Sequence, residues 1–421
     1  MSEEKKGFPI YRMNEIHSML CDLETNKYID LPFTEVKAYL LDDRDVLFNR
    51  TNSYEWVGRT GIYYKHDNLE RTFASYLVRF IPDPNIITPE YLTCYLNTRQ
   101  GVRDLKRRAR ESINQTNINP EEVKEVEIPI LSAELQNIVS YNLHLAHKQR
   151  TSAILLYQQA EDILLEELDL KNFKPNQQAI NIKSNKDSFE ITGRLDAEYY
   201  LPKYEEIINH IKSIHHKLLK ELVIIKKSVE PGSNAYDTEG IPFIRVADYN
   251  KIGISEPTLK LKKDYYNANK ERLDDLMLKK DTILLSKDGS IGVAYLMTED
   301  SNSITSGAIL HLTIQDDNIL PEYLTLVLNS KVVQQQAERD SGGSIIDHWR
   351  ISQVQDTIIP ILNIEKQRSI CNLVKQSFAL KSQAENLLDI AKQAVEIAIE
   401  CDEETAMEFI TQNTNKMNFI N

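Results

Sequence analysis

The sequence has few cysteines, no long apolar run and no excess of positive charge, and each shortage excludes a class of protein. Its four cysteines form no C-x-x-C pair, so neither a disulfide framework nor a zinc ribbon is expected. Its 50 Lys and Arg face 63 Asp and Glu, a net charge of −13, which excludes coating of nucleic acid by bulk charge. No run reaches the roughly 18 apolar residues of a membrane span, and the polar start MSEEKKGFPI lacks a signal peptide's apolar stretch. We therefore expect a soluble, cytoplasmic protein without membrane contact.

Motifs for catalysis and metal binding are also missing. The sequence contains no G-x-x-x-x-G-K-[ST], H-E-x-x-H or G-x-S-x-G, and no N-P-P-[FY] or D-P-P-[FY] loop for a flipped base. The pairs His144/His147 and His215/His216 have no evident third ligand, so we interpret them as surface or packing histidines. We expect no catalytic residue, no metal and no cofactor bound by this chain.

The strongest feature present is an internal repeat. PEYLTCYLNT (89–98) matches PEYLTLVLNS (321–330) at seven of ten positions, with an offset of 232. Further along, I-P-I-L-x-x-E-x-Q occurs at 128–136 and again at 359–367. Upstream, GFPIYR (7–12) resembles GIPFIR (240–245), and Asp45-Val46-Leu47-Phe48 resembles Asp281-Thr282-Ile283-Leu284. A preserved order at a near-constant offset indicates tandem duplication.

Each copy begins with short apolar runs broken by Gly, Pro, Asn and Asp. The runs at 45–50, 76–81, 281–286 and 308–314 predict strands, and the PEYL segments predict short helices with Pro in the first turn. Each copy then enters a long stretch without Gly or Pro, 130–174 and 361–421. Three- and four-residue apolar spacing predicts two helices of about 35 residues, each about 50 Å long. We expect them to pack against each other as a coiled coil, the alternative being two core helices in separate domains. The packing residues would be Val139, Leu143, Tyr157, Leu164, Val374, Phe378, Leu388 and Val395.

The two copies are not symmetric at their starts. The segment GRLDAEYYLPKYEEIINHIKS (193–213) and its continuation to 239 have no counterpart before residue 7. The polar stretch 171–192 is expected to be a linker, and 401–421 a flexible tail.

The segment RQGVRDLKRRAR (99–110) holds six basic residues against one acid. As a helix it would place most of them on one broad face able to neutralise phosphates, the alternative being an ordinary solvated face. The following ESINQTNIN (111–119) adds amides, which can pair with adenine edges. From these segments the candidate DNA-binding residues are Arg103, Arg107, Arg108, Asn114 and Gln115.

Two further loops follow predicted strands, where recognition residues are often held on a rigid frame, and a third, 339–350, corresponds in position to 108–119. In the loop 49–59 the candidates are Asn49, Arg50, Tyr54, Trp56 and Arg59. In the matching loop 286–292 they are Ser286, Lys287 and Ser290, while Gly58 and Gly292 are expected to serve turns. In 339–350 they are Ser344, His348 and Arg350. The framework repeats while the loops differ, which suggests two modules that read different targets.

The layout resembles the DNA specificity (S) subunit of type I restriction-modification systems. The resemblance is carried by the duplicated framework, by Arg-Leu-Asp-Ala-Glu-Tyr-Tyr at 194–200, and by the repeated I-P-I-L-x-x-E-x-Q before each long helix. It covers the chain from about residue 7 to 400 and implies an α+β fold. Two tandem target-recognition domains would be separated by two long antiparallel helices packed as a coiled coil. It implies target-recognition domain 1 at 1–132, short at its N-terminus, spacer helices at 133–170 and 363–400, and target-recognition domain 2 at 193–362.

The resemblance also implies function and partners. It implies a non-catalytic subunit that reads a bipartite DNA site and directs two DNA adenine methyltransferase subunits and the restriction/translocase subunits. S-adenosylmethionine, ATP and Mg²⁺ would be bound by those partners and not by this chain. The short start of copy 1 is expected to reflect a truncated gene, a late start codon or an exchangeable cassette, in which case its half-site would be read weakly or not at all. A silent or donor cassette of the same family is an alternative, and a coiled-coil scaffold or cryptic nuclease is a more distant one.

Overall fold

The computed structural model describes residues 1–113, 115–342 and 347–418. The chain divides into unit 1, residues 1–154 with residues from 379 onward, and unit 2, residues 155–378. Each unit contains one copy of the repeat together with part of each long helix. These helices are α5 (Ala133–Glu167) and α14 (Ile364–Glu400), as the absence of Gly and Pro predicts.

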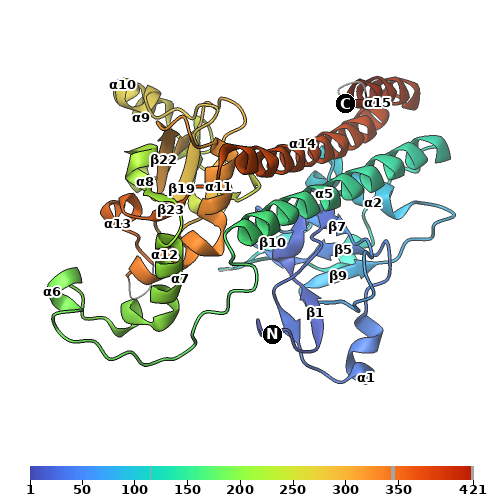
Figure 1. Cartoon of the computed structure of the whole chain (residues 1–421). Helices are drawn as coiled ribbons and strands as arrows, with labels where there is room; N and C mark the ends of the chain where they lie inside the picture. The colour runs from blue at the N-terminus through green and yellow to red at the C-terminus, as the bar shows by residue number, and fades with distance from the viewer. Residues whose placement is uncertain (114, 343–346, 419–421) are drawn as a thin grey trace. The chain divides into compact units, whose positions relative to one another are not determined.

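A five-stranded sheet forms the centre of unit 1. Its strand order is β2 (Ile16–His17), β3 (Leu20–Cys21), β7 (Thr60–Ile62), β5 (Val46–Asn49) and β9 (Leu77–Phe80). Every residue of β5 is buried, as expected for a strand covered on both faces. The helices α2 (Pro89–Leu96) and α5 cover this sheet in a shared apolar core (Figure 1).

Smaller elements complete unit 1. A three-stranded sheet has the order β4 (Tyr28–Ile29), β1 (Phe8–Tyr11) and β8 (Thr72–Phe73). The remaining short helices are α1 (Phe33–Val36), α3 (Arg99–Arg107) and α4 (Pro120–Val123). The predicted strands at 45–50 and 76–81, and the predicted Pro-initiated helix at 89, are thus confirmed.

Unit 2 repeats this plan with extra elements. Its main sheet has the order β13 (Val223–Lys227), β22 (Ile309–Ile314), β19 (Ile283–Ser286) and β20 (Ala294–Leu296). A second sheet has the order β14 (Tyr236–Asp237), β18 (Lys260–Leu261), β15 (Ile241–Ile244) and β21 (Ile304–Thr305). Two-stranded pairs are β12 (His216–Leu218) with β23 (Ile358–Pro360), and β16 (Tyr249–Asn250) with β17 (Gly253–Ile254). Its helices are α6 (Phe189–Thr192), α7 (Pro202–Lys212), α8 (Leu219–Leu222), α9 (Lys263–Ala268), α10 (Lys270–Asp274), α11 (Pro321–Asn329), α12 (Lys331–Asp340) and α13 (Ile351–Gln355).

The backbone shows the duplication more sharply than the sequence does. Arg44 and Asp281 both have a positive φ, 69° and 65°, and each lies two residues before its strand, β5 or β19. Their N–H groups donate to Tyr63 O and Met297 O at 2.8 and 2.9 Å. The sequence comparison paired Asp45 with Asp281; the structure corrects that pairing by one residue, since Arg44 occupies the equivalent position.

The two signature segments of each copy bind one another. The Tyr91 hydroxyl donates to Pro129 O at 2.6 Å, and the Tyr323 hydroxyl donates to Pro360 O at 2.9 Å. Gln136 and Gln367, both buried, accept from the backbone N–H groups of Thr88 and Leu320 at 2.9 and 3.0 Å. The signatures therefore fix the start of each long helix against the PEYL helix before it.

The apolar stripes of α5 and α14 enter the cores of both units. Of the eight predicted packing residues, Val139, Leu143, Leu388 and Val395 lie in the core of unit 1. In unit 2, Tyr157, Leu164 and Val374 are buried and Phe378 packs against them. Gln149 contacts Gln383 in unit 1, and Glu167 pairs with Lys366 in unit 2. Late residues of α5 thus contact early residues of α14, so the two helices run in opposite directions.

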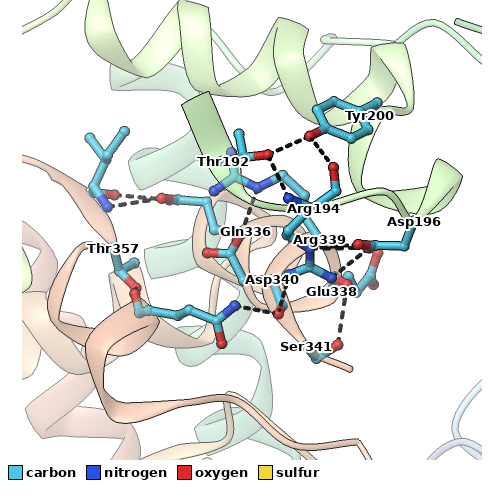
Figure 2. Close-up of polar contacts among 12 residues, drawn as sticks. Thr192, Arg194, Asp196, Tyr200, Gln336, Glu338, Arg339, Asp340, Ser341 and Thr357 are labelled. Atoms are coloured by element: carbon cyan, nitrogen blue, oxygen red, sulfur yellow. Dashed lines mark hydrogen bonds and ion pairs between the residues drawn. The ribbon is translucent and has the colours of Figure 1, made fainter. Parts of the chain in front are cut away.

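The front segment of copy 2 holds the end of α12. Arg194 pairs with Asp196 and donates from Nη1 to Asp340 O at 2.9 Å, while Gln353 Nε2 donates to the same carbonyl at 2.7 Å (Figure 2). The Tyr199 ring lies 4.5 Å from the Arg194 guanidinium and 4.8 Å from that of Arg339. The Arg-Leu-Asp-Ala-Glu-Tyr-Tyr motif therefore acts as a clamp on the last residue of α12.

In unit 1 the end of the corresponding helix is held by different contacts. Here α3 is the counterpart of α12, and Gln100 and Asp104 stand where α12 buries Val332 and Gln336. Arg108, the counterpart of Asp340, pairs with Asp104 and donates from Nη2 to Glu125 O at 2.8 Å. The end of α3 is thus tied down by its own side chain, without a front segment.

The sheet edge of unit 1 is adapted in the same way. In unit 2, β13 pairs along β22 as far as Ile314. At the offset of 232 the counterpart of Ile314 is Pro82, which has no N–H to donate. A proline at that position discourages addition of another strand, so β9 remains an edge strand.

Residues 401–421 were expected to be a flexible tail, and the structure corrects this over its described part. Residues Glu403–Asn418 form α15. Ala406 and Ile410 are fully buried, and the Glu403 carboxylate accepts from Ser132 N at 3.0 Å. The i, i+4 apolar pair supplies the packing stripe that the composition obscured. None of the helices in the described ranges combines the length and apolarity of a membrane span.

The helix stripes give a first prediction. Leu164→Ala should destabilise unit 2 and Leu388→Ala unit 1, each by about 2–5 kcal/mol, because each removes a buried side chain. Leu155→Ala is the matched control, since Leu155 lies on the same helix and is 58% exposed; its effect should stay within about 0.5 kcal/mol. Urea unfolding measures the loss, and hydrogen exchange read by mass spectrometry locates it. A loss for Leu155→Ala equal to the others would contradict the assignment.

A second prediction concerns His311 in β22. Its side chain is buried, its Nε2 lies 2.7 Å from Thr305 Oγ1, and burial lowers its pKa to about 4. An unfolded histidine titrates near 6.5, so on acidification the unfolded state takes up the proton first. Stability should fall as pH drops from about 6.5 towards 4, and His311→Gln should remove about 2 kcal/mol of the loss between pH 7 and pH 5. Urea unfolding at the two pH values tests this; parallel losses in wild type and variant would refute it.

Candidate nucleic-acid interface

Three candidate DNA-binding residues of copy 1, Arg50, Arg108 and Gln115, directly border a short three-stranded ribbon. It consists of β6 (Thr51–Asn52), β11 (Thr116–Ile118) and β10 (Ala109–Glu111), with β11 in the middle. Asn117 faces Thr51 on one side and Arg110 on the other. We call this the first ribbon.

Copy 2 has the same arrangement over a shorter length. His348 forms antiparallel bridges with Asp288 on one side and with Gly342 on the other. The N–H of Trp349 donates to Lys287 O at 2.7 Å, as the N–H of Ile118 donates to Arg50 O at 2.9 Å. We call this the second ribbon. Its register matches the first, so Thr51, Asn117 and Arg110 correspond to Asp288, His348 and Gly342.

Alternation along the middle strand separates an inner from an outer face. Thr116 and Ile118 are buried, as is Trp349, and they anchor the ribbons to the units. Asn117 and His348 lie between or beside them and point the other way, because successive side chains of a strand alternate. The three aligned positions therefore form one outer row across each ribbon.

The rows differ in chemistry although their backbones match. In the first, Thr51 Oγ1 donates to Asn117 Oδ1 at 2.6 Å. In the second, His348 Nδ1 lies 2.8 Å from Asp288 Oδ1, and Lys287 pairs with the other Asp288 oxygen. A cavity of about 740 Å³ borders the second ribbon, with Arg194, Asp196, Asp340, His348 and Arg350 among its walls. The clamp and the second ribbon thus share one surface.

Two predicted contact residues are instead framework residues, and this is a correction. Asn49 and Ser286, at equivalent strand ends, are completely buried. Asn49 Nδ2 donates to Trp56 O at 3.2 Å, while Ser286 Oγ donates to Ser290 O and accepts from Val293 N. Both close the following loop. Their turns use Gly58 and Gly292, whose φ values are +91° and +77°, which confirms the turn role expected for these glycines.

Among the other candidates of the loop 49–59, some side chains stabilise the loop and others are exposed to solvent. The Arg59 guanidinium lies 3.5 Å from the centre of the Trp56 ring and donates to Ile16 O at 3.3 Å, and burial lowers its pKa to about 10. Tyr54 is half exposed beneath the Lys106 ammonium, 4.6 Å from its ring centre. Tyr54 is therefore the outward residue, and Trp56 with Arg59 stabilises the loop.

The basic segment 99–110 does not form the single helical face that was expected. The helix ends at Arg107, and Arg110 lies in β10, where it pairs with Glu122. Arg108 is largely covered in its tie to Glu125 O, which corrects its assignment as a phosphate contact. Arg103 and Arg107 remain exposed on α3; Arg107 pairs with Asp104 at 2.5 Å, and Arg103 has no polar partner within the described ranges.

The remaining candidates lie around the ribbon tips. Gln115 is exposed where β10 turns into β11, Ser290 is exposed in the loop after β19, and Arg350 is exposed at the start of α13. Arg50 and Lys287 are partly buried at matching positions, at or next to the start of their ribbon strands. Asn114 and Ser344 lie outside the described residues.

The predicted contact residues did not include Thr51 or Asp288, and Asn117 was noted only as one of the amides in 111–119. Each lay inside a segment already singled out, but the residues were ranked by side-chain type and not by strand register. Pairing of 51 with 117 depends on a contact across 66 positions, which spacing alone does not predict. The alternation of side chains in T-N-I (116–118) is typical of a strand with one outward face, and it indicates that Asn117 points outward.

The histidine pair at 144 and 147 has a packing role. Both rings contact Tyr64, at 5.4 and 4.6 Å between centroids, and burial lowers the pKa of His147 to about 4. Across the described ranges, no three His, Cys, Asp or Glu side chains gather as a metal site would need.

Comparison with known proteins identifies relatives. A family model described as "Type I restriction modification DNA specificity domain" matches residues 211–389. The putative type I restriction enzyme MjaX specificity subunit of Methanocaldococcus jannaschii is 30% identical over 141 residues, 33% of each chain. The EcoBI specificity subunit of Escherichia coli is 27% identical over 191 residues, which is 44% of this chain and 37% of that subunit. The matched stretches thus span about a third of these relatives.

Among solved structures, the type I restriction-modification S subunit of M. genitalium matches 99% of this chain and 87% of its own, with 13% identity and a TM-score of 0.35. The sequence matches are what carry the assignment. Residues 211–389 therefore match a type I restriction-modification DNA specificity domain, and over this range the match agrees with the resemblance carried by the repeat and its signatures.

Proposed function

We propose that this chain is the DNA-recognition subunit of a type I restriction-modification complex and reads a bipartite site. The observation that carries the proposal is the pair of ribbons, which have one backbone register and two different outer rows. A shared frame with different polar side chains is what two readers of different base sequences require, because base edges are distinguished by donor and acceptor pattern. The chain itself would contribute no catalytic group.

We further propose that the two units act as tandem target-recognition domains. The helices α5 and α14 would serve as their spacer, packed as an antiparallel coiled coil. Support comes from the antiparallel contacts within each unit and from the burial of both helices in both cores. An ideal helix of 35 residues is about 52 Å long, which exceeds one turn of B-DNA.

The partners proposed are duplex DNA, two adenine methyltransferase subunits and restriction/translocase subunits. S-adenosylmethionine, ATP and Mg²⁺ would belong to those partners.

Base-resolution methylation mapping tests the proposal. The chain is expressed with a type I adenine methyltransferase subunit that co-purifies with it, in a host lacking other adenine methylation, and the genome is compared with that of a strain without the chain. We expect a split motif with an unspecified gap that disappears when the chain is removed. A motif with only one specified half would show that copy 1 does not read DNA. No motif, with the methyltransferase bound, would contradict the proposal and favour a silent or donor cassette.

The exposed cations of α3 give a separate prediction. Arg103→Ala with Arg107→Ala should weaken binding of the complex to all duplexes alike and reduce the salt slope by about 2, because phosphate contacts carry no sequence information. Lys37→Ala with Lys65→Ala removes the same charge from exposed positions of unit 1 outside α3 and the ribbon; it should change neither. Arg108→Ala should lower thermal stability instead. Fluorescence anisotropy across salt concentrations provides the measurement, and an unchanged slope in the α3 variant would rule out the phosphate role.

A further inference from the structure

Each ribbon places one hydrogen-bonded side-chain pair at the same backbone position. The pairs are Thr51 with Asn117 and Asp288 with His348, joined at 2.6 and 2.8 Å. Their neighbours match as well, since the buried anchor after the middle residue is Ile118 in one ribbon and Trp349 in the other. The outer rows thus differ in chemistry, while the anchor that follows the middle residue is buried and apolar in both ribbons.

The pairs are presented outward and are held rigidly. The His348 side chain is 59% exposed, whereas Asp288 beneath it is 19% exposed. Thr51 and Asn117 are partly exposed on the corresponding face. In each pair one member supports the other, so the presented group loses little conformational freedom when it binds, which favours selective recognition.

The first pair presents an amide. Because Thr51 Oγ1 donates to Asn117 Oδ1, the Asn117 amide is oriented with its NH₂ group unused by Thr51. An asparagine amide offers a donor and an acceptor side by side, the pattern that pairs with N7 and the N6 amino group of adenine. Among bases in the major groove, adenine is therefore the best match for this row.

The second pair presents an imidazole. The Asp288 carboxylate can only accept, so Nδ1 of His348 carries the hydrogen, and Nε2 is left facing outward. In the neutral ring Nε2 accepts, and in the imidazolium it donates. Lys287, held on the other Asp288 oxygen, adds a cation beneath the ring. This row offers a single nitrogen and no amide, so it cannot make the paired contact available to Asn117.

We propose that these two pairs are specificity-determining: Thr51–Asn117 fixes the preference at one base pair of one half-site, and Asp288–His348 fixes it at one base pair of the other. The inference rests on the proposed function and adds to it the residues that read the base. It assigns this role to the outer rows and not to the buried strand ends Asn49 and Ser286.

A reciprocal exchange tests the proposal. One variant carries Thr51→Asp with Asn117→His, and the other Asp288→Thr with His348→Asn, each as the full chain with its methyltransferase. Methylation mapping on a randomised-site library should show one base position changed in a single half-site per variant, by roughly 5- to 150-fold in preference. The other half-site and the gap should remain as in wild type. A wild-type half-site retained unchanged in both variants would overturn the inference.

Controls separate this failure from others. If the wild-type complex shows no split motif, it is the proposed function that fails, and this result is distinguished from failure of the residue exchange. Circular dichroism melting and co-purification with the methyltransferase establish that each variant folds and assembles. Should the exchange destabilise a ribbon, the isosteric Asn117→Asp replaces it, since it keeps the side-chain shape but removes the NH₂ donors. Its folded complex should lose the adenine-type preference at one position, and full retention would equally overturn the inference. Lys65→Ala, at an exposed position of unit 1 outside α3 and the ribbon, is the control and should leave that base position unchanged.

Discussion

Burial of the apolar stripes of α5 and α14 is the constraint on which the rest of the structure depends. Ala146 and Ala391 are completely buried in the core of unit 1, and Ala160 and Leu164 in that of unit 2. The core of each unit includes buried residues from both α5 and α14. The same two helices therefore contribute to the folding free energy of both copies of the repeat. Such sharing explains why the buried Gln136 and Gln367 fix each helix start so firmly: a one-turn slip would expose both cores.

The framework and the outer rows respond to different physical demands. Core positions must conserve volume and polarity, because a cavity or an unpaired polar group costs several kcal/mol. Tyr91 and Tyr323, which donate to equivalent carbonyls, illustrate how closely the copies agree where burial sets the requirement. The outer rows carry no such requirement, so Thr51 can correspond to Asp288 without disturbing the strands beneath. Divergence is therefore concentrated where solvent, or a ligand, replaces protein as the neighbour.

Much of the fold could be predicted from the sequence because its signals are local. The lack of Gly and Pro gave α5 and α14 to within a few residues, and Pro89 and Pro321 marked the helices they begin. The site was harder, since Asn117 meets Thr51 only through long-range strand register. Arg108 shows the same limit: its type and surroundings indicated a phosphate contact, but its tie to Glu125 O depends on how the chain folds back. The α15 stripe of Ala406 and Ile410 was hidden by acidic and amide residues around it.

The two copies differ at the helix that the front segment of copy 2 contacts, which is α12 in unit 2 and corresponds to α3 in unit 1. In unit 2 the front segment is needed, because α12 buries Val332 and Val333 and would expose them without cover. In unit 1 the same positions hold Gln100 and Gly101, and Gly101 leaves no room for a side chain, its Cβ position lying 2.2 Å from Tyr95 O. The helix therefore sits tightly on α2 and leaves a polar surface outward. The exposed surface of α3 carries Arg103 and Arg107 beside Val102, which is 38% exposed. The two copies thus carry different side chains at equivalent helix positions, polar or small in α3 and apolar in α12.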